Sequence, residues 1–126
     1  EILKEFREFL ASKEFIDFMK QLTGMTLKSK VIDVNGSMYQ FTDFLLPHDD
    51  QLEGRKIAFM YYLSTLTKRD GGALALFDSK ASKIVKELYP EANCFKFFKV
   101  SDVSFHQVNE IVSQKQRISI NGWFHG

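Results

Sequence analysis

The chain has 126 residues, which is the length of one domain and leaves little room for a second. Apolar residues make up 44% of it, enough for a packed core, so extensive disorder is excluded. Its 17 basic and 16 acidic residues nearly cancel, so charge gives no support for nucleic acid as a direct partner. No apolar run is long enough for a membrane span, and the single cysteine, Cys94, suits a reducing compartment, the cytoplasm or nucleus.

The N-terminal segment, about residues 1–24, has the periodicity of an amphipathic helix. Its apolar side chains recur every three or four positions, while most of its charged side chains face away from them. Gly24 is well placed to end the helix, because glycine readily adopts the left-handed conformation that follows a last helical turn. Ser12 could interrupt or recap the chain, so one bent helix and two helices are both open. We expect this segment to pack against the rest of the domain.

From about residue 30 to residue 126 the pattern changes to short β-type segments separated by turn residues such as Asn35-Gly36. The expected strands cover residues 38–46, 56–65, 73–77, 95–100, 104–112 and 117–124. Residues 80–88 form either a short helix or a loop along a strand edge. Many short strands in succession favour an antiparallel sandwich or barrel. The sequence therefore predicts one mainly β domain over residues 1–126, with N-terminal helices and a barrel core.

His48 and Asp50 form a candidate metal site. In an extended segment, positions i and i+2 share a side, so these two side chains can converge while Asp49 points away. A second imidazole would come from His106, in a β-type segment far along the chain. Two imidazoles and one carboxylate make the facial triad of non-haem Fe(II) oxygenases, which leaves positions open for co-substrate and O2. A core role for His106, or a three-histidine site that uses His125, are the alternatives.

The last β-type segment carries a candidate anion site. Alternation places four polar or amphipathic side chains on one face: Arg117, Ser119, Asn121 and Trp123. An inward-facing arginine is costly unless an anion meets it, and its planar fork matches a carboxylate. A dicarboxylate that chelates iron through its keto-acid end would present its far carboxylate to Arg117. The hydroxyl of Tyr62 could join Arg117 there; its alternative role is that of a core tyrosine.

Several blocks of residues resemble a known family. They are Tyr39 to Asp50, Leu52 to Phe59 with Tyr62 and Leu63, Gly71 to Leu74, Ser104 to Val108, and Arg117 to Gly126. Through them the chain resembles the 2-oxoglutarate- and Fe(II)-dependent prolyl hydroxylases, and within that class it is most similar to the catalytic domain of the eukaryotic ribosomal prolyl 3-hydroxylases. The resemblance implies the family fold, a double-stranded β-helix, which is a cupin-like jelly-roll barrel flanked by helices.

The resemblance also implies roles for individual residues. The iron ligands would be His48, Asp50 and His106. The residues that bind 2-oxoglutarate would be Arg117, Tyr62 and Tyr39. In an unbroken strand Tyr39 would have the opposite parity to His48, but Pro47 is expected to interrupt that strand. Trp123 would form a wall of the site near His106.

The activity implied by the resemblance is that of a dioxygenase that hydroxylates a proline in a small-subunit ribosomal protein. Its cofactors would be Fe(II), 2-oxoglutarate and O2, with ascorbate (vitamin C) as reductant. One alternative is an oxygenase of a free amino acid or small metabolite. Another is a regulatory protein-binding module that retains the metal site. Eukaryotic members carry a second, degenerate barrel domain, so the chain is expected to be a catalytic domain or a shorter relative.

Overall fold

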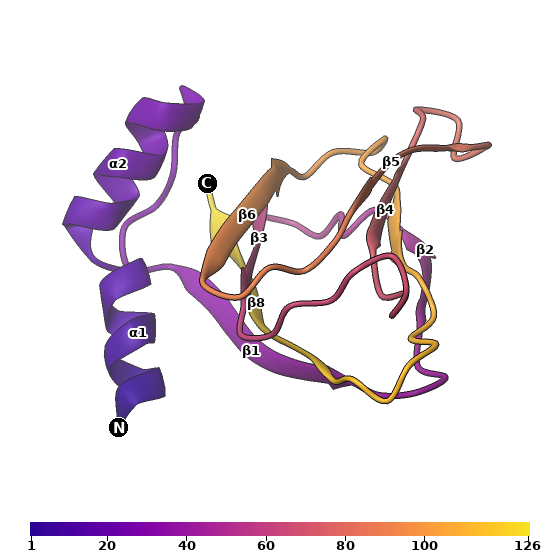
Figure 1. The fold of residues 1–126 in the computed structure, drawn as a ribbon. Helices are drawn as coiled ribbons and strands as arrows, with labels where there is room; N and C mark the ends of the chain where they lie inside the picture. The colour runs from indigo at the N-terminus through magenta and orange to yellow at the C-terminus, as the bar shows by residue number, and fades with distance from the viewer.

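All 126 residues are described in this computed structural model, which has two α-helices followed by eight β-strands (Figure 1). The helices are α1 (Ile2–Leu10) and α2 (Lys13–Thr23). The strands are β1 (Ile32–Tyr39), β2 (Leu45–His48), β3 (Arg55–Tyr62), β4 (Leu74–Phe77), β5 (Ile84–Leu88), β6 (Cys94–Lys99), β7 (His106–Val108) and β8 (Arg117–His125). This confirms the predicted mainly β domain with helices at its N-terminus.

The N-terminal segment forms two helices, because Ser12 starts a new one. Its side chain accepts a hydrogen bond from the backbone N–H of Phe15 (3.2 Å), which satisfies a donor that the first turn of α2 leaves free. Gly24 then ends α2 with a φ of 69°, as predicted. Neither helix has the length and hydropathy needed to cross a membrane.

The strands form two antiparallel sheets of four strands each. One has the order β1-β8-β3-β6 and the other the order β2-β7-β4-β5. Successive strands pass from one sheet to the other, and only β4 and β5 are consecutive strands paired in the same sheet. The two sheets are not joined by hydrogen bonds into a closed barrel. In Figure 1 the helices lie beside the β1-β8-β3-β6 sheet, on its side away from β2, β4 and β5.

The larger core lies between the helices and that sheet. Its buried side chains include Leu10, Ile16, Met19, Ile57, Phe59 and Phe124. Along β3, Ile57 and Phe59 face the helices. The alternate residues Met60 and Tyr62 face the second sheet and pack with Leu74. Burial of a side chain such as Phe59 contributes about 1.5–3 kcal/mol. The helices therefore cover one face of β3 and β8, and the opposite face is left to line the space between the sheets.

Three local predictions were wrong. Asn35 and Gly36 do not form a turn: they lie within β1, where they pair with Asn121 and Ile120 of β8. Residues 84–88 form an edge strand rather than a helix or loop. The strand expected at 38–46 is divided between β1 and β2, with Thr42 between them at a φ of 75°. In the first two cases cross-strand pairing decides the conformation, which local propensity does not show.

Gly122 of β8 lies where no side chain fits. A Cβ there would collide with the carbonyl oxygen of Asp33 and lie 2.6 Å from Cζ of Phe59. We expect Gly122→Ala to lower the free energy of unfolding by about 3 kcal/mol, measured by urea denaturation. Gly36→Ala, on the adjacent strand β1 with no atom within 4 Å of its Cβ, is the matched control and should change stability by less than about 0.5 kcal/mol. Equal stabilities of the two variants would contradict the packing described here.

Candidate active site

A cavity of about 200 Å³ lies between the two sheets. Its walls come from six strands or their ends, β1, β2, β3, β4, β7 and β8, so residues from both halves of the chain meet in it. Apolar side chains form one part of the wall: Leu45, Ala58, Met60, Leu74 and Val108. Two groups of polar side chains lie in the cavity, one around His48 and the other around Arg117, and Asn35, Ser37 and Asn121 line it as well.

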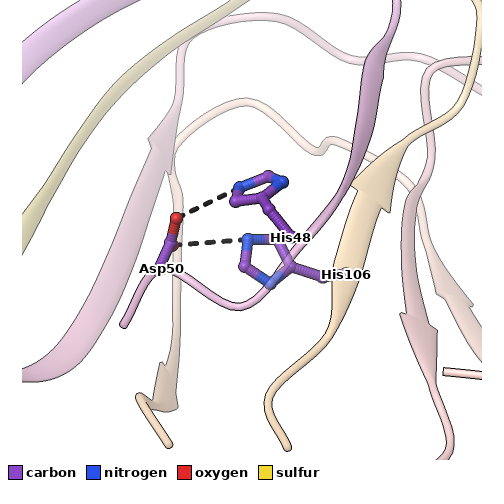
Figure 2. Close-up of side chains that lie close together, drawn as sticks. All are labelled: His48, Asp50 and His106. Carbon is purple, nitrogen blue, oxygen red and sulfur yellow. Dashed lines mark ion pairs between the residues drawn. The ribbon is translucent and has the colours of Figure 1, made fainter. Parts of the chain in front are cut away.

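The first group is a compact triad of His48, Asp50 and His106 (Figure 2). The two histidines are partners in the β2–β7 ladder, and their ring centroids are 4.2 Å apart. Oδ1 of Asp50 is 3.1 Å from Nε2 of His48, and Oδ2 is 3.3 Å from Nε2 of His106. Strand alternation is not what brings Asp50 to His48, because β2 ends at His48 and Asp50 has a φ of 64°. The left-handed backbone conformation of Asp50 directs its carboxylate back toward the two imidazole rings.

The hydrogen bonds of the two imidazoles leave both Nε2 atoms for a ligand. Nδ1 of His48 lies 2.8 Å from the carbonyl oxygen of Leu46, and Nδ1 of His106 lies 2.8 Å from that of Ser104. A carbonyl oxygen only accepts, so both Nδ1 atoms carry the proton and both Nε2 atoms face Asp50. Three lone-pair donors within 4.8 Å of one another require protons or a cation between them. This donor set fits a divalent transition metal.

The electrostatics of the triad show what a metal would replace. Burial alone would raise the pKa of Asp50, but hydrogen bonds from His106 and His48 outweigh burial and hold this pKa well below its usual range. The hydrogen bond to Asp50 raises the pKa of His48 against the opposing effect of burial. Without a metal, a proton on His48 therefore partly neutralises the carboxylate.

We expect metal affinity to fall as the pH is lowered. A metal binds neutral His48, and its raised pKa keeps the ring protonated above the ordinary value of 6.5. The proton therefore competes with the metal up to a higher pH than for an ordinary histidine. The affinity for Mn(II), measured from the electron paramagnetic resonance signal of the free ion between about pH 6 and 8, should still rise above pH 6.5. A constant affinity over that range would contradict this assignment.

Two residues outside the triad hold the Asp50 carboxylate in place. The indole N–H of Trp123 donates to Oδ2 of Asp50 (3.3 Å). The guanidinium of Arg55 lies 3.5 Å from the centre of the Trp123 ring and donates to the backbone carbonyl of Asp50 (3.3 Å). Trp123 was predicted as a wall of the site. Arg55 was not predicted, because its role depends on stacking against a residue of β8, a strand that is adjacent in the sheet but distant in the sequence.

The second group is built around a buried cation. The Arg117 side chain donates from Nε to the carbonyl oxygen of Gly72 (2.9 Å) and from Nη2 to the hydroxyl of Tyr62 (3.3 Å). Its guanidinium also lies 5.4 Å from the Tyr39 ring. Arg117 is only 2% exposed, burial lowers its pKa, and none of the ion pairs in the chain includes it. A guanidinium in this state is a candidate site for an anion.

The structure brings together the predicted site residues. Arg117 and Tyr39 are partners in the β1–β8 ladder, and both line the cavity. Strand alternation does not relate the directions of the Tyr39 and His48 side chains, because the two residues lie in different sheets. Tyr62 is fully buried and does not itself line the cavity, but its hydroxyl accepts a hydrogen bond from Arg117, which does. His125 lies elsewhere, with Nε2 2.8 Å from Asp33, so it does not join the triad.

Comparisons with known proteins place the chain in a family. A family model described as the 2OG-Fe(II) oxygenase superfamily matches residues 34–125. Prolyl 3-hydroxylase OGFOD1 of Mus musculus is 46% identical over 93% of this chain, and prolyl 3-hydroxylase sudestada1 of Drosophila melanogaster is 37% identical over 99% of it. This chain spans only 22% and 25% of their respective lengths.

Among solved structures, the prolyl-4-hydroxylase of Pseudomonas putida is similar, with a TM-score of 0.72 and 22% sequence identity. The match covers 89% of this chain and 61% of that one. This likeness concerns the fold alone, and it confirms the predicted double-stranded β-helix.

Proposed function

The chain belongs to the 2OG-Fe(II) oxygenase superfamily, and from this membership we propose that it is the catalytic domain of a dioxygenase that hydroxylates a prolyl residue in a protein. One observation carries the proposal. A histidine–aspartate–histidine triad and a buried arginine without an anionic partner line one cavity. A metal site beside a carboxylate site is what an enzyme that uses both Fe(II) and 2-oxoglutarate requires.

In this proposal the polar groups around His48 and those around Arg117 have separate roles. His48, Asp50 and His106 bind the metal through the two Nε2 atoms and a carboxylate oxygen. When bound, Fe(II) and 2-oxoglutarate supply the oxidising chemistry that divides O2 between the substrate and succinate, with release of CO2. Trp123 and Arg55 hold the Asp50 carboxylate in a position from which it and the two histidines can bind the same metal ion.

Arg117 and Tyr62 bind the far carboxylate of 2-oxoglutarate. The Tyr62 hydroxyl already lies against Nη2 of Arg117, so the two groups can donate to the same carboxylate. The ring of Tyr39 walls this end of the cavity. The apolar side chains of Leu45, Leu74 and other wall residues keep water from the bound co-substrate, and this strengthens every charge interaction there.

The substrate is proposed from the relatives. The two animal proteins described above are named as prolyl 3-hydroxylases, so a proline in a protein is the favoured target. We propose a small-subunit ribosomal protein as that target and ascorbate as the reductant that maintains Fe(II). Hydroxylation of a free amino acid, or a regulatory role through protein binding, are the outcomes that would replace this proposal.

The test uses the chain with Fe(II), 2-oxoglutarate, ascorbate and proline-containing peptides from small-subunit ribosomal proteins. Mass spectrometry should find one added oxygen on a prolyl residue, with formation of succinate in equal amount. The His106→Ala variant should form neither product. Oxidation of free amino acids instead of peptides would favour the small-molecule reading. Peptide binding without succinate would favour the regulatory one, and no succinate with any substrate would overturn the proposed activity.

A further inference from the structure

Three polar side chains form a closed hydrogen-bonded ring on the wall that β1 and β8 contribute to the cavity. They are Ser37, Ser119 and Asn121. The two serine hydroxyl oxygens are 3.0 Å apart, the Ser119 hydroxyl donates to Oδ1 of Asn121 (2.9 Å), and Nδ2 of Asn121 donates to the Ser37 hydroxyl (2.8 Å). None of the three belongs to the metal triad or to the carboxylate site around Arg117.

The direction of each hydrogen bond in the ring follows from the chemistry of its members. Oδ1 of Asn121 only accepts, so the single proton of Ser119 is directed at it. The bond between the serines is therefore donated by Ser37, which in turn accepts from Nδ2 of Asn121. Bonds that run in one direction around a ring strengthen one another. If Oδ1 and Nδ2 of Asn121 exchange places, the three hydrogen bonds run in the opposite direction. One N–H of Nδ2 is again left without a partner.

One donor remains free. The ring uses both hydroxyl protons and one N–H of the Asn121 amide, so the second N–H of Nδ2 has no partner in the chain. Asn121 lines the cavity, and its side chain is hydrogen-bonded to neither of its ladder partners, Asn35 on β1 and Met60 on β3. The acceptor for this N–H must therefore come from a molecule bound in the cavity, or from water that this molecule displaces.

The position of Asn121 indicates which molecule. Along the inner face of β8, the order is Arg117, Ser119, Asn121 and Trp123. Arg117 is the anion site, and Trp123 is bonded to Asp50 of the triad. Asn121 thus lies between the two ends at which a keto diacid would be held. Its free N–H is closer along the strand to the triad end, where the keto group and its neighbouring carboxylate would lie.

We propose that Asn121 donates a hydrogen bond to the carboxylate next to the keto group of 2-oxoglutarate, and that Ser37 and Ser119 position its amide for this bond. This rests on the proposed function, because it assumes that the cavity binds a keto diacid together with a metal. Asn121 is then a co-substrate-binding residue, and the two serines are positioning residues.

The test measures binding rather than turnover. Trp123 is the only tryptophan and lines the cavity, so its fluorescence reports binding of 2-oxoglutarate in the presence of Mn(II). Asn121→Ala should weaken 2-oxoglutarate binding about tenfold or more, because a hydrogen bond to a charged group is lost. Ser119→Ala should weaken it less, about two- to fivefold, since the amide keeps its donor and loses only its orientation. Mn(II) affinity without 2-oxoglutarate should be unchanged in both variants.

The controls separate this inference from the proposed function. Asn109→Ala removes an amide outside the cavity, where it bonds to Gln107 and Glu87, and should leave 2-oxoglutarate affinity unchanged. Thermal melting shows whether each variant is folded. If Asn121→Ala binds 2-oxoglutarate as tightly as the native chain, or loses Mn(II) to the same extent, the inference is overturned while the proposed function stands. If Arg117→Ala also binds 2-oxoglutarate normally, the proposed function fails as well.

Discussion

Asp50→Ala should weaken metal binding at least about 100-fold and, under the proposed function, prevent the formation of succinate. Asp50 is the only anion in the triad, and its two oxygens lie within 3.3 Å of the two histidine Nε2 atoms. Without it, two neutral imidazoles remain to hold a divalent cation in a cavity with apolar walls. Changes to groups that only support a ligand reduce metal affinity about 10–100-fold, so loss of the ligand itself should reduce it by at least about 100-fold. The free-ion signal of Mn(II) measures this directly.

Asp49→Ala is the matched control for that variant, because it removes the adjacent carboxylate. Oδ1 of Asp49 accepts only from the backbone N–H of Gln51 (2.9 Å), and the side chain does not belong to the triad. This variant should bind Mn(II) as the native chain does. The assignment of Asp50 as a ligand would be rejected if both aspartate variants retained the metal.

Arg117→Met should separate stability from binding. The guanidinium is buried without an anion, and an apolar side chain of similar length can replace such a group at little loss of stability. The free energy of unfolding should therefore change by less than about 1 kcal/mol, since the lost bonds to Gly72 and Tyr62 are offset by relief of the buried charge. The affinity for 2-oxoglutarate should nevertheless fall about 100-fold, because the charge partner of its far carboxylate is gone.

Two measurements check this prediction. Urea denaturation gives the stability of the free chain, and the rise in melting temperature on addition of 2-oxoglutarate with Mn(II) gives binding. The native chain should be stabilised by the co-substrate, and the Arg117→Met variant should not. Tyr62→Phe, which removes one hydroxyl beside Arg117, is the graded control and should weaken binding about five- to tenfold. An Arg117→Met variant with unaltered affinity would remove this residue from the co-substrate site.

Residues whose role depends on strand parity could be predicted from the sequence. Alternation along β8 predicts which of its side chains point inward, and it therefore predicts that Arg117 is buried. The meeting of His48 with Asp50 was predicted correctly but for an incomplete reason, because a left-handed residue rather than an extended strand turns the carboxylate back. The family resemblance contributed Tyr39, which parity alone did not favour.

What could not be predicted depends on which strands are neighbours. The contact between Ser37 and Ser119 joins residues 82 positions apart, and it exists because β1 and β8 pair in one particular register. Asn35-Gly36 has the composition of a turn, so the sequence did not predict β1, which forms one wall of the cavity. Arg55 acquires its role only when β3 and β8 are adjacent, so that it lies on the Trp123 ring. Short-range patterns contain none of this information.

The place of β8 in its sheet determines the order in which this domain can fold. β8 is synthesised after the other seven strands, yet it lies between β1 and β3 and pairs with both. Until residues 117–125 leave the ribosome, β1 and β3 have no common partner, and their edges are open to pairing with other chains. The β1-β8-β3-β6 sheet can therefore be completed only once residues 117–125 have been synthesised, and it cannot form progressively from the N-terminus. A nascent chain that stops before β8 lacks both a continuous sheet and the arginine that would hold a co-substrate.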